Sequence, residues 1–128
     1  LAAHKRLPFF LKSLIEVDQK LKNKIFVKVV LDNPDKSNQP FLNFQNIDIE
    51  FQYKINREQI FSLYSRSKNF VTTSLYESYY LPLYEAHYFG CHLVVPKAGY
   101  TEDLNFSVNL FECDSEQSLA KSLLSNLS

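Results

Sequence analysis

Apolar and polar residues recur along this chain with two different periods, and these periods divide it into helical and extended segments. Spacings of three and four residues predict helices, whereas alternation or short β-branched runs predict strands. The expected helices cover residues 7–21, 56–67, 82–89 and 114–127. The expected strands cover residues 24–31, 47–53, 69–73, 92–95 and 106–111, with a polar loop at 32–39 and another loop at Gly99.

Several helix ends carry their own sequence signals. Asn56 is followed three residues later by Gln59, and Asp114 by Gln117, so both positions are expected to cap the helices that follow them. Gly90 is expected to end a helix in the left-handed conformation.

The alternation of strands with helices predicts βαβ units. We therefore expect a Rossmann-like α/β fold, in which one parallel sheet carries helices on both faces. Ligands of such sheets bind at the carboxyl ends of the strands. No repeat or linker divides residues 1–128, so a single domain is expected. The opening at Leu1 led us to expect a piece of a longer protein.

Composition narrows the function classes. The 128 residues are 45% hydrophobic and 22% charged, with zero net charge, as in an ordinary globular domain. The balanced charge argues against a nucleic-acid binder, and no apolar run is long enough for a transmembrane helix. Cys91 and Cys113 are expected to be free, buried thiols of a cytoplasmic protein. Zero net charge leaves room for a peripheral contact with a membrane that other parts of the longer protein would make.

The chemically informative stretch is residues 73–86, which follows an expected strand and begins an expected helix. No Ser, Thr, Asp or Asn immediately precedes Pro82, so the first amides of that helix lack a side-chain cap. Water or an anionic ligand such as a diphosphate would satisfy them.

Two carboxylates stand in this stretch, eight residues apart. Glu77 is expected on the loop after the strand, and Glu85 in the first turn of the helix, facing that loop. A carboxylate there can accept hydrogen bonds from two ribose hydroxyls. It can equally well complement the helix dipole, and spacing alone favours that simpler role.

The same stretch resembles the donor-site signature of GT-B glycosyltransferases, especially the retaining enzymes of family 4. That signature reads S-x-x-E-G/S-F-G-x-P-x-x-E-A, with seven residues between its glutamates. The matching positions are Ser74, Glu77, Ser78, Tyr79, Pro82, Glu85 and Ala86. Weaker similarities flank it in the same order as in the family, at residues 5–8, 57–64, 90–95 and 99–102.

The resemblance implies the carboxyl-terminal, nucleotide-sugar-binding half of a two-domain, metal-independent enzyme that needs no cofactor. It implies Glu77 beside the transferred sugar and Glu85 on the donor ribose. Backbone N–H groups of Ser78, Tyr79, Tyr80 and Leu81 would meet the sugar and diphosphate, Lys5 or Arg6 would neutralise the diphosphate, and Lys54 and Ile55 would hold the base. A separate amino-terminal domain would bind the saccharide or lipid-linked acceptor.

Some positions depart from the family pattern. Ser78 and Tyr80 stand where glycine is usual, His92 where proline is, and Tyr100 where a second glycine is. These departures motivate the alternative of a non-catalytic binding or assembly domain that keeps the fold. The tyrosines near the motif are candidate sugar platforms, although the helical spacing of Tyr80, Tyr84 and Tyr88 favours packing. His4, His87 and His92 form no metal-ligand pattern.

Overall fold

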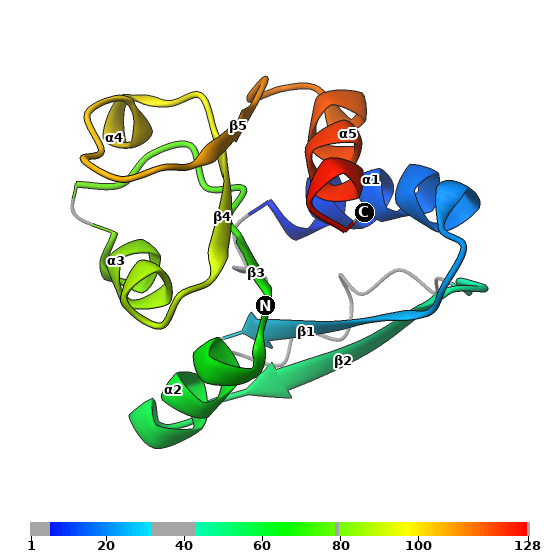
Figure 1. The fold of residues 1–128 in the computed structure, drawn as a ribbon, viewed down its shortest axis with the longest axis horizontal. Coiled ribbons are helices and arrows are strands. Elements are labelled where there is room, and N and C mark those ends of the chain that lie inside the picture. The colour runs from blue at the N-terminus through cyan, green and yellow to red at the C-terminus, as the bar shows by residue number, and fades with distance from the viewer. Residues whose placement is uncertain (1–5, 32–42, 79, 128) are drawn as a thin grey trace.

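The structure is a computed structural model that describes residues 6–31, 43–78 and 80–127. Apart from one short helical turn, α4, helices and strands follow one another in the order that the periodicity predicts (Figure 1). The elements are α1 (Leu7–Lys20), β1 (Ile25–Leu31), β2 (Ile47–Tyr53), α2 (Arg57–Arg66), β3 (Asn69–Val71), α3 (Leu81–Tyr88), β4 (His92–Pro96), α4 (Gly99–Glu102), β5 (Asn109–Phe111) and α5 (Glu116–Leu127).

All strand pairs are parallel, and they form two groups. β1 pairs with β2 from Ile25↔Ile47 to Leu31↔Tyr53, and β4 lies between β3 and β5. The expected α/β chain with parallel strands is thereby confirmed. Among the described residues no ladder joins β1 to β3, so the structure shows two small parallel groups where one continuous sheet was expected.

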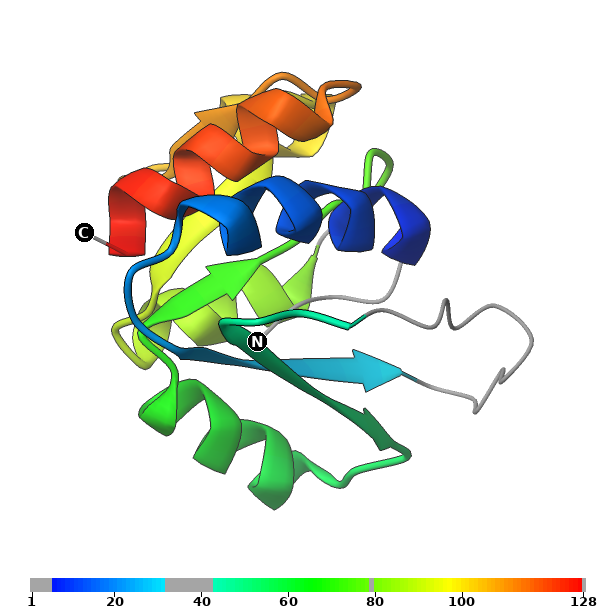
Figure 2. The same cartoon turned by 90° about the vertical axis from the view of Figure 1, so that its right-hand side faces the viewer.

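Helices cover both faces of the strands. A larger core packs α1 and α5 against residues of both strand groups, including Val29, Val71 and Val94. The intervening residues Phe70 and Leu93 face the other way, into a second core with α2 and α3. Because alternate residues of a strand point to opposite faces, these two cores confirm the expected helices on both sides (Figure 2).

Two helix-end signals are confirmed. The side chain of Asn56 accepts a hydrogen bond from the backbone N–H of Gln59, and the Gln59 side chain accepts one from the N–H of Asn56. This reciprocal pair begins α2. Gly90 has φ +85° directly after α3, a backbone conformation that glycine adopts without steric cost.

The expected cap of the last helix was wrong by one residue. The hydroxyl of Ser115, not the carboxylate of Asp114, accepts the hydrogen bond from the N–H of Ser118, at 3.0 Å. Asp114 instead faces the guanidinium of Arg6. α5 begins at Glu116, so Ser115 and not Asp114 is the residue directly before the helix.

Three strand and loop boundaries also differ from the expectation. β3 ends at Val71 and β5 begins only at Asn109, so both strands are shorter than expected. The segment at Gly99 is a single helical turn, α4, rather than a loop. Thr101 stabilises it, because its hydroxyl accepts from the N–H of Ala98 and donates to the carbonyl of Pro96. The polar loop expected at 32–39 lies outside the described residues.

None of the helices in the described segments has the length and apolar character that crossing a bilayer requires.

Candidate functional site

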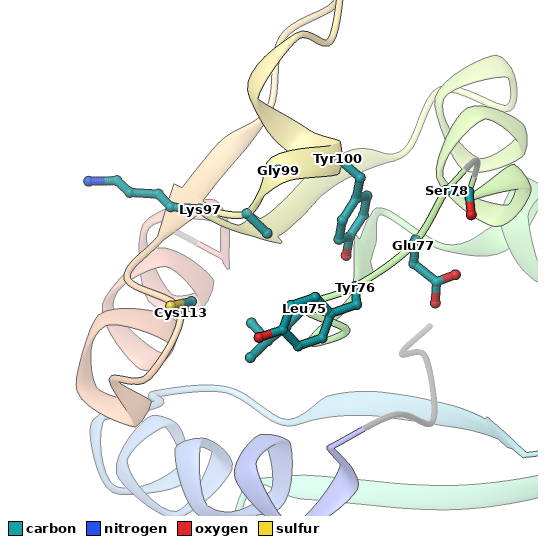
Figure 3. A pocket seen from close by; sticks show the side chains of 9 residues that line it. Leu75, Tyr76, Glu77, Ser78, Lys97, Gly99, Tyr100 and Cys113 are labelled. Atoms are coloured by element: carbon teal, nitrogen blue, oxygen red, sulfur yellow. The ribbon is translucent and has the colours of Figure 1, made fainter.

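A hollow of about 830 Å³ lies at the carboxyl ends of β3, β4 and β5 (Figure 3). Its walls come from the loops that follow these three parallel strands. The lining residues are Leu75, Tyr76, Glu77, Ser78, Lys97, Ala98, Gly99, Tyr100 and Cys113. This is the edge of an α/β fold where ligands commonly bind, because the loops after parallel strands converge there.

Glu77 brings a carboxylate to this hollow. The hydroxyl of buried Ser74 donates a hydrogen bond to Oε1 of Glu77, at 2.9 Å. The N–H of Ser74 is in turn 3.3 Å from the hydroxyl oxygen of Thr72. The loop after β3 therefore holds Glu77 at the rim through short local contacts, with Ser78 exposed beside it.

Tyr100 forms the opposite wall. Its hydroxyl donates to the carbonyl of Ser74, at 2.5 Å, and its ring meets the ring of Tyr80 edge to face, 6.0 Å between centroids. Burial raises the pKa of the Tyr100 hydroxyl. Tyr100 lines the hollow, and the ring of Tyr80 packs beside it.

Arg6 connects the two loops that follow β3 and β5, next to the hollow. Its Nη1 donates to the carbonyl of Cys113 at 2.7 Å and is 3.3 Å from the carbonyl of Thr73. Its Nη2 lies 3.5 Å from Oδ1 of Asp114, and the guanidinium sits 4.0 Å from the ring centroid of Phe9. These contacts occupy the guanidinium with loop groups, so the structure gives Arg6 a bracing position. Lys5 lies outside the described residues.

Glu85 lies in the second turn of α3, not in the first turn as expected, because the helix begins at Leu81. Its carboxylate faces α2, where Nη2 of Arg57 donates to Oε2 at 2.6 Å. Only 15% of the Glu85 side chain is exposed. Burial raises the pKa of Tyr64 on α2, and the neighbouring Glu85 carboxylate adds to that shift. Glu85 is not among the residues that line the hollow.

The loop after β2 leads into α2, whose first residue, Arg57, pairs with Glu85. Lys54 has φ +51° and donates its N–H to the carbonyl of Leu31, at 3.3 Å. Ile55 is half-buried, and Arg57 follows two residues later as the first residue of α2. Arg57 thus links the start of α2 to the expected ribose carboxylate, while Lys54 and Ile55 are not among the residues that line the hollow.

The amino-terminal end of α3 has no side-chain cap, as the sequence predicts. Tyr80 is its N-cap residue and forms no capping hydrogen bond with its side chain. Leu81, the first helical residue, is 43% exposed. Tyr79 falls outside the part of the chain that the structure describes.

Some residues of the hollow, and the partner of Glu85, were not singled out from the sequence. The lining residues Leu75, Lys97 and Ala98 were not proposed as site residues, and Arg57 pairs with Glu85. Tyr76, one of the candidate sugar platforms, lines the hollow and is 85% exposed, and Cys113, expected only as a free thiol, lines it too. Lys97 directly follows β4, a position that could have marked it as a candidate. Its ammonium extends away from Glu77 in Figure 3 and lies 2.5 Å from Oε1 of Glu112.

The remaining expectations have mixed outcomes. Tyr84 packs edge to face on Phe106, as expected, whereas Tyr88 is 84% exposed. Both cysteines are free, but only Cys91 is buried, so the expected burial of Cys113 was wrong. Within the described residues no group of three or more His, Cys, Asp or Glu side chains is placed to hold a metal ion.

No protein-family model matches the chain, and no curated protein matches it either.

Proposed function

We propose that the chain is the donor half of a retaining glycosyltransferase and binds a nucleotide diphosphate sugar. The observation that carries this proposal is the position of Glu77. It stands in a hollow at the carboxyl ends of three parallel strands, eight residues before a second carboxylate on the next helix. The type of reaction, retaining glycosyl transfer, is inferred from the resemblance of residues 74–86 to the donor-site signature.

The proposed ligand would extend from the hollow toward α2. Its sugar would lie beside Glu77 and Ser78, and its diphosphate would meet the uncapped amides at Tyr80 and Leu81, where a helix begins. Its ribose would reach Glu85, displacing or sharing Arg57. In this proposal Lys54 and Ile55 contact the base. The proposal also includes a single continuous Rossmann-like sheet, as in one half of the GT-B fold.

The proposed chemistry needs the leaving diphosphate to be stabilised as its charge develops. Lys5 is proposed for that role, because the described contacts of Arg6 engage its guanidinium elsewhere. The acceptor would come from an amino-terminal domain of a longer, cytoplasmic protein. The 128-residue chain is therefore expected to bind nucleotide but to transfer no sugar.

The first prediction concerns Glu85→Ala. Removing the proposed ribose carboxylate should weaken binding of uridine or guanosine diphosphate at least tenfold, which corresponds to about 1.4 kcal/mol. Isothermal titration calorimetry measures this change. Glu16→Ala is the matched control, because it removes a carboxylate from α1 that pairs only locally, with Lys20. Unchanged affinity in Glu85→Ala would refute the ribose role.

A second candidate function is a non-catalytic binding or assembly domain. The contact that favours it is the Tyr100 hydroxyl on the Ser74 carbonyl, together with the Tyr80 ring against Tyr100. Both side chains take up room where the family pattern has glycine. Absence of binding to a panel of nucleotide sugars, measured on the full-length protein, would favour this alternative over the donor-site proposal.

A further inference from the structure

A second hollow, of about 420 Å³, lies at the opposite end of the strands from the one that contains Glu77. Residues at the start of β1 and the start of β3 line it, together with residues of α1, α5 and the last turn of α2. β1 and β3 approach each other there (Figure 2), and no ladder of hydrogen bonds joins them within the described segments. The hollow therefore occupies the seam between the two strand groups.

The inner wall of this second hollow is hydrocarbon. Leu14 and Val17 come from α1, Leu63 from α2, Val71 from β3 and Leu123 from α5. All five are buried core residues. Because these five are already buried, the apolar surface open to a ligand lies further out, at Phe26, which is 71% exposed, and at half-buried Ile25 and Leu127. A ligand chain that covers this surface would exchange water for apolar contacts, which favours an apolar occupant.

The rim is basic. Lys28, Arg66 and Lys68 line the hollow, and no acidic residue is among the described residues that do so. Glu50 on β2 stands next to this rim and forms an ion pair with Lys28. It offsets one of the three positive charges, and the remaining two favour an anion. An apolar lining with a basic rim is complementary to an amphiphile that has a hydrocarbon chain and an anionic head group.

We propose that this hollow binds a long-chain carboxylate, with the acyl chain against Ile25, Phe26 and Leu127 and the carboxylate at Lys28, Arg66 and Lys68. Arginine and lysine form strong, charge-assisted hydrogen bonds with carboxylates. The volume lies within the range of small-molecule sites. The inference does not depend on nucleotide-sugar binding, because the two hollows share no lining residue.

Dodecanoate, below its micelle-forming concentration, is the probe. Calorimetry on the whole 128-residue chain should show saturable binding at least tenfold tighter than for butyrate, which has the same head and a short chain. It should also be at least tenfold tighter than for dodecyltrimethylammonium, which has the same chain and the opposite charge. These two comparisons separate the contribution of the wall from that of the rim.

Three exposed substitutions test the orientation of the ligand. Lys68→Glu should weaken dodecanoate binding at least fivefold. Glu50→Gln should strengthen it at least twofold, because it frees Lys28 from its ion pair. A gain in affinity cannot arise from misfolding. Lys12→Glu is the control, since Lys12 is exposed on α1 and does not line the hollow, and it should leave the affinity unchanged.

Four outcomes of these measurements would overturn the proposal, and so would a fifth with vesicles. These are no saturable binding of dodecanoate, equal binding of the cationic amphiphile, no effect of Lys68→Glu, and equal weakening by Lys12→Glu. Binding to vesicles of anionic phospholipid without binding to dodecanoate would also overturn it, in favour of a membrane-surface contact.

Discussion

Arg6 connects parts of the chain that are far apart in sequence. Its guanidinium reaches the carbonyls of Thr73 and Cys113 and the carboxylate of Asp114, while it covers the ring of Phe9. Thr73 and Cys113 belong to loops at two different strands, and Cys113 lines the hollow that contains Glu77. A single residue at the start of α1 thus fixes the spacing between two walls of the candidate site.

Replacing this residue should destabilise the fold. We expect Arg6→Ala to lower the free energy of unfolding by about 2 kcal/mol, because part-buried carbonyls lose a charged donor. Urea denaturation followed by circular dichroism measures the loss. Lys12→Ala, at an exposed position of the same helix, should change stability by less than about 0.5 kcal/mol. Equal effects of the two substitutions would contradict the bracing role.

Two tyrosines, Tyr64 in the core and half-buried Tyr100, make the stability depend on alkaline pH. Burial raises the pKa of Tyr64 and Tyr100 above the ordinary value of 10.0. Below that value both hydroxyls are neutral in folded and unfolded chains, so their contribution is fully present. As the pH rises past it, the unfolded chain releases protons that the folded chain retains, and stability falls.

The corresponding test is a series of urea midpoints between about pH 8 and pH 11, a window around the ordinary tyrosine pKa. The variant Tyr64→Phe/Tyr100→Phe should lose less stability across this window than the unchanged chain. The loss of the Tyr100 hydrogen bond shifts all midpoints alike, so the slope is the informative quantity. Tyr88→Phe, at an 84% exposed position, should retain the original slope.

At the scale of elements, α5 offers a test of its corrected cap. Ser115→Ala should cost about 1 kcal/mol, because the N–H of Ser118 loses its acceptor at the start of the helix. Asp114→Ala should cost less than about 0.5 kcal/mol, since its contact with Arg6 is long and Asp114 is 82% exposed. Thermal unfolding of the two variants compares them directly. A larger loss in Asp114→Ala would restore the original assignment.

The contrast between α2 and α5 shows which elements the sequence predicts well. Asn56 and Gln59 satisfy each other within one turn, so the beginning of α2 depends on local sequence alone. At α5, Asp114 and Ser115 are both good caps. Ser115 caps the helix, and the side chain of Asp114 faces Arg6, which lies 108 residues away in the chain. Local patterns carry no information about such a partner.

The candidate site likewise has features that depend on local sequence and features that depend on long-range contacts. The order of Ser74 and Glu77 after a strand predicts a carboxylate at the strand's carboxyl end, and their hydrogen bond is local. The orientation of Glu85 was not predictable, because it depends on Arg57, 28 residues away on another helix. Likewise, Tyr100 closes the hollow through a contact with Ser74 across 26 residues.

At the scale of the whole molecule, one core joins the two strand groups. α1 and α5 pack against each other, and their buried residues contact Val27 and Val29 of β1 as well as Val94 of β4. No backbone ladder joins the groups in the described segments. Side-chain packing beneath α1 and α5 therefore holds the two strand groups together.

Leu119→Ala tests this role of the core. Leu119 on α5 is fully buried, so its truncation should lower the free energy of unfolding by about 3 kcal/mol. Hydrogen exchange should show faster exchange at amides of both β1 and β4. Acceleration confined to β3–β5 would mean that the two groups unfold separately. Leu110→Ala, at a 41% exposed position of β5, is the control and should have a much smaller effect.

The outer edge of β2 has a consequence for how copies of the chain avoid one another. β2 pairs with β1 on one side, and in the described segments no strand pairs with its other side. Such an edge is a template for cross-β assembly. Asp48 and Glu50 place carboxylates on this strand, each in an exposed ion pair, with Lys24 and Lys28 respectively. Because the chain has no net charge to keep copies apart, protection from fibrillar aggregation falls to such local charges, and high salt, by screening them, weakens it.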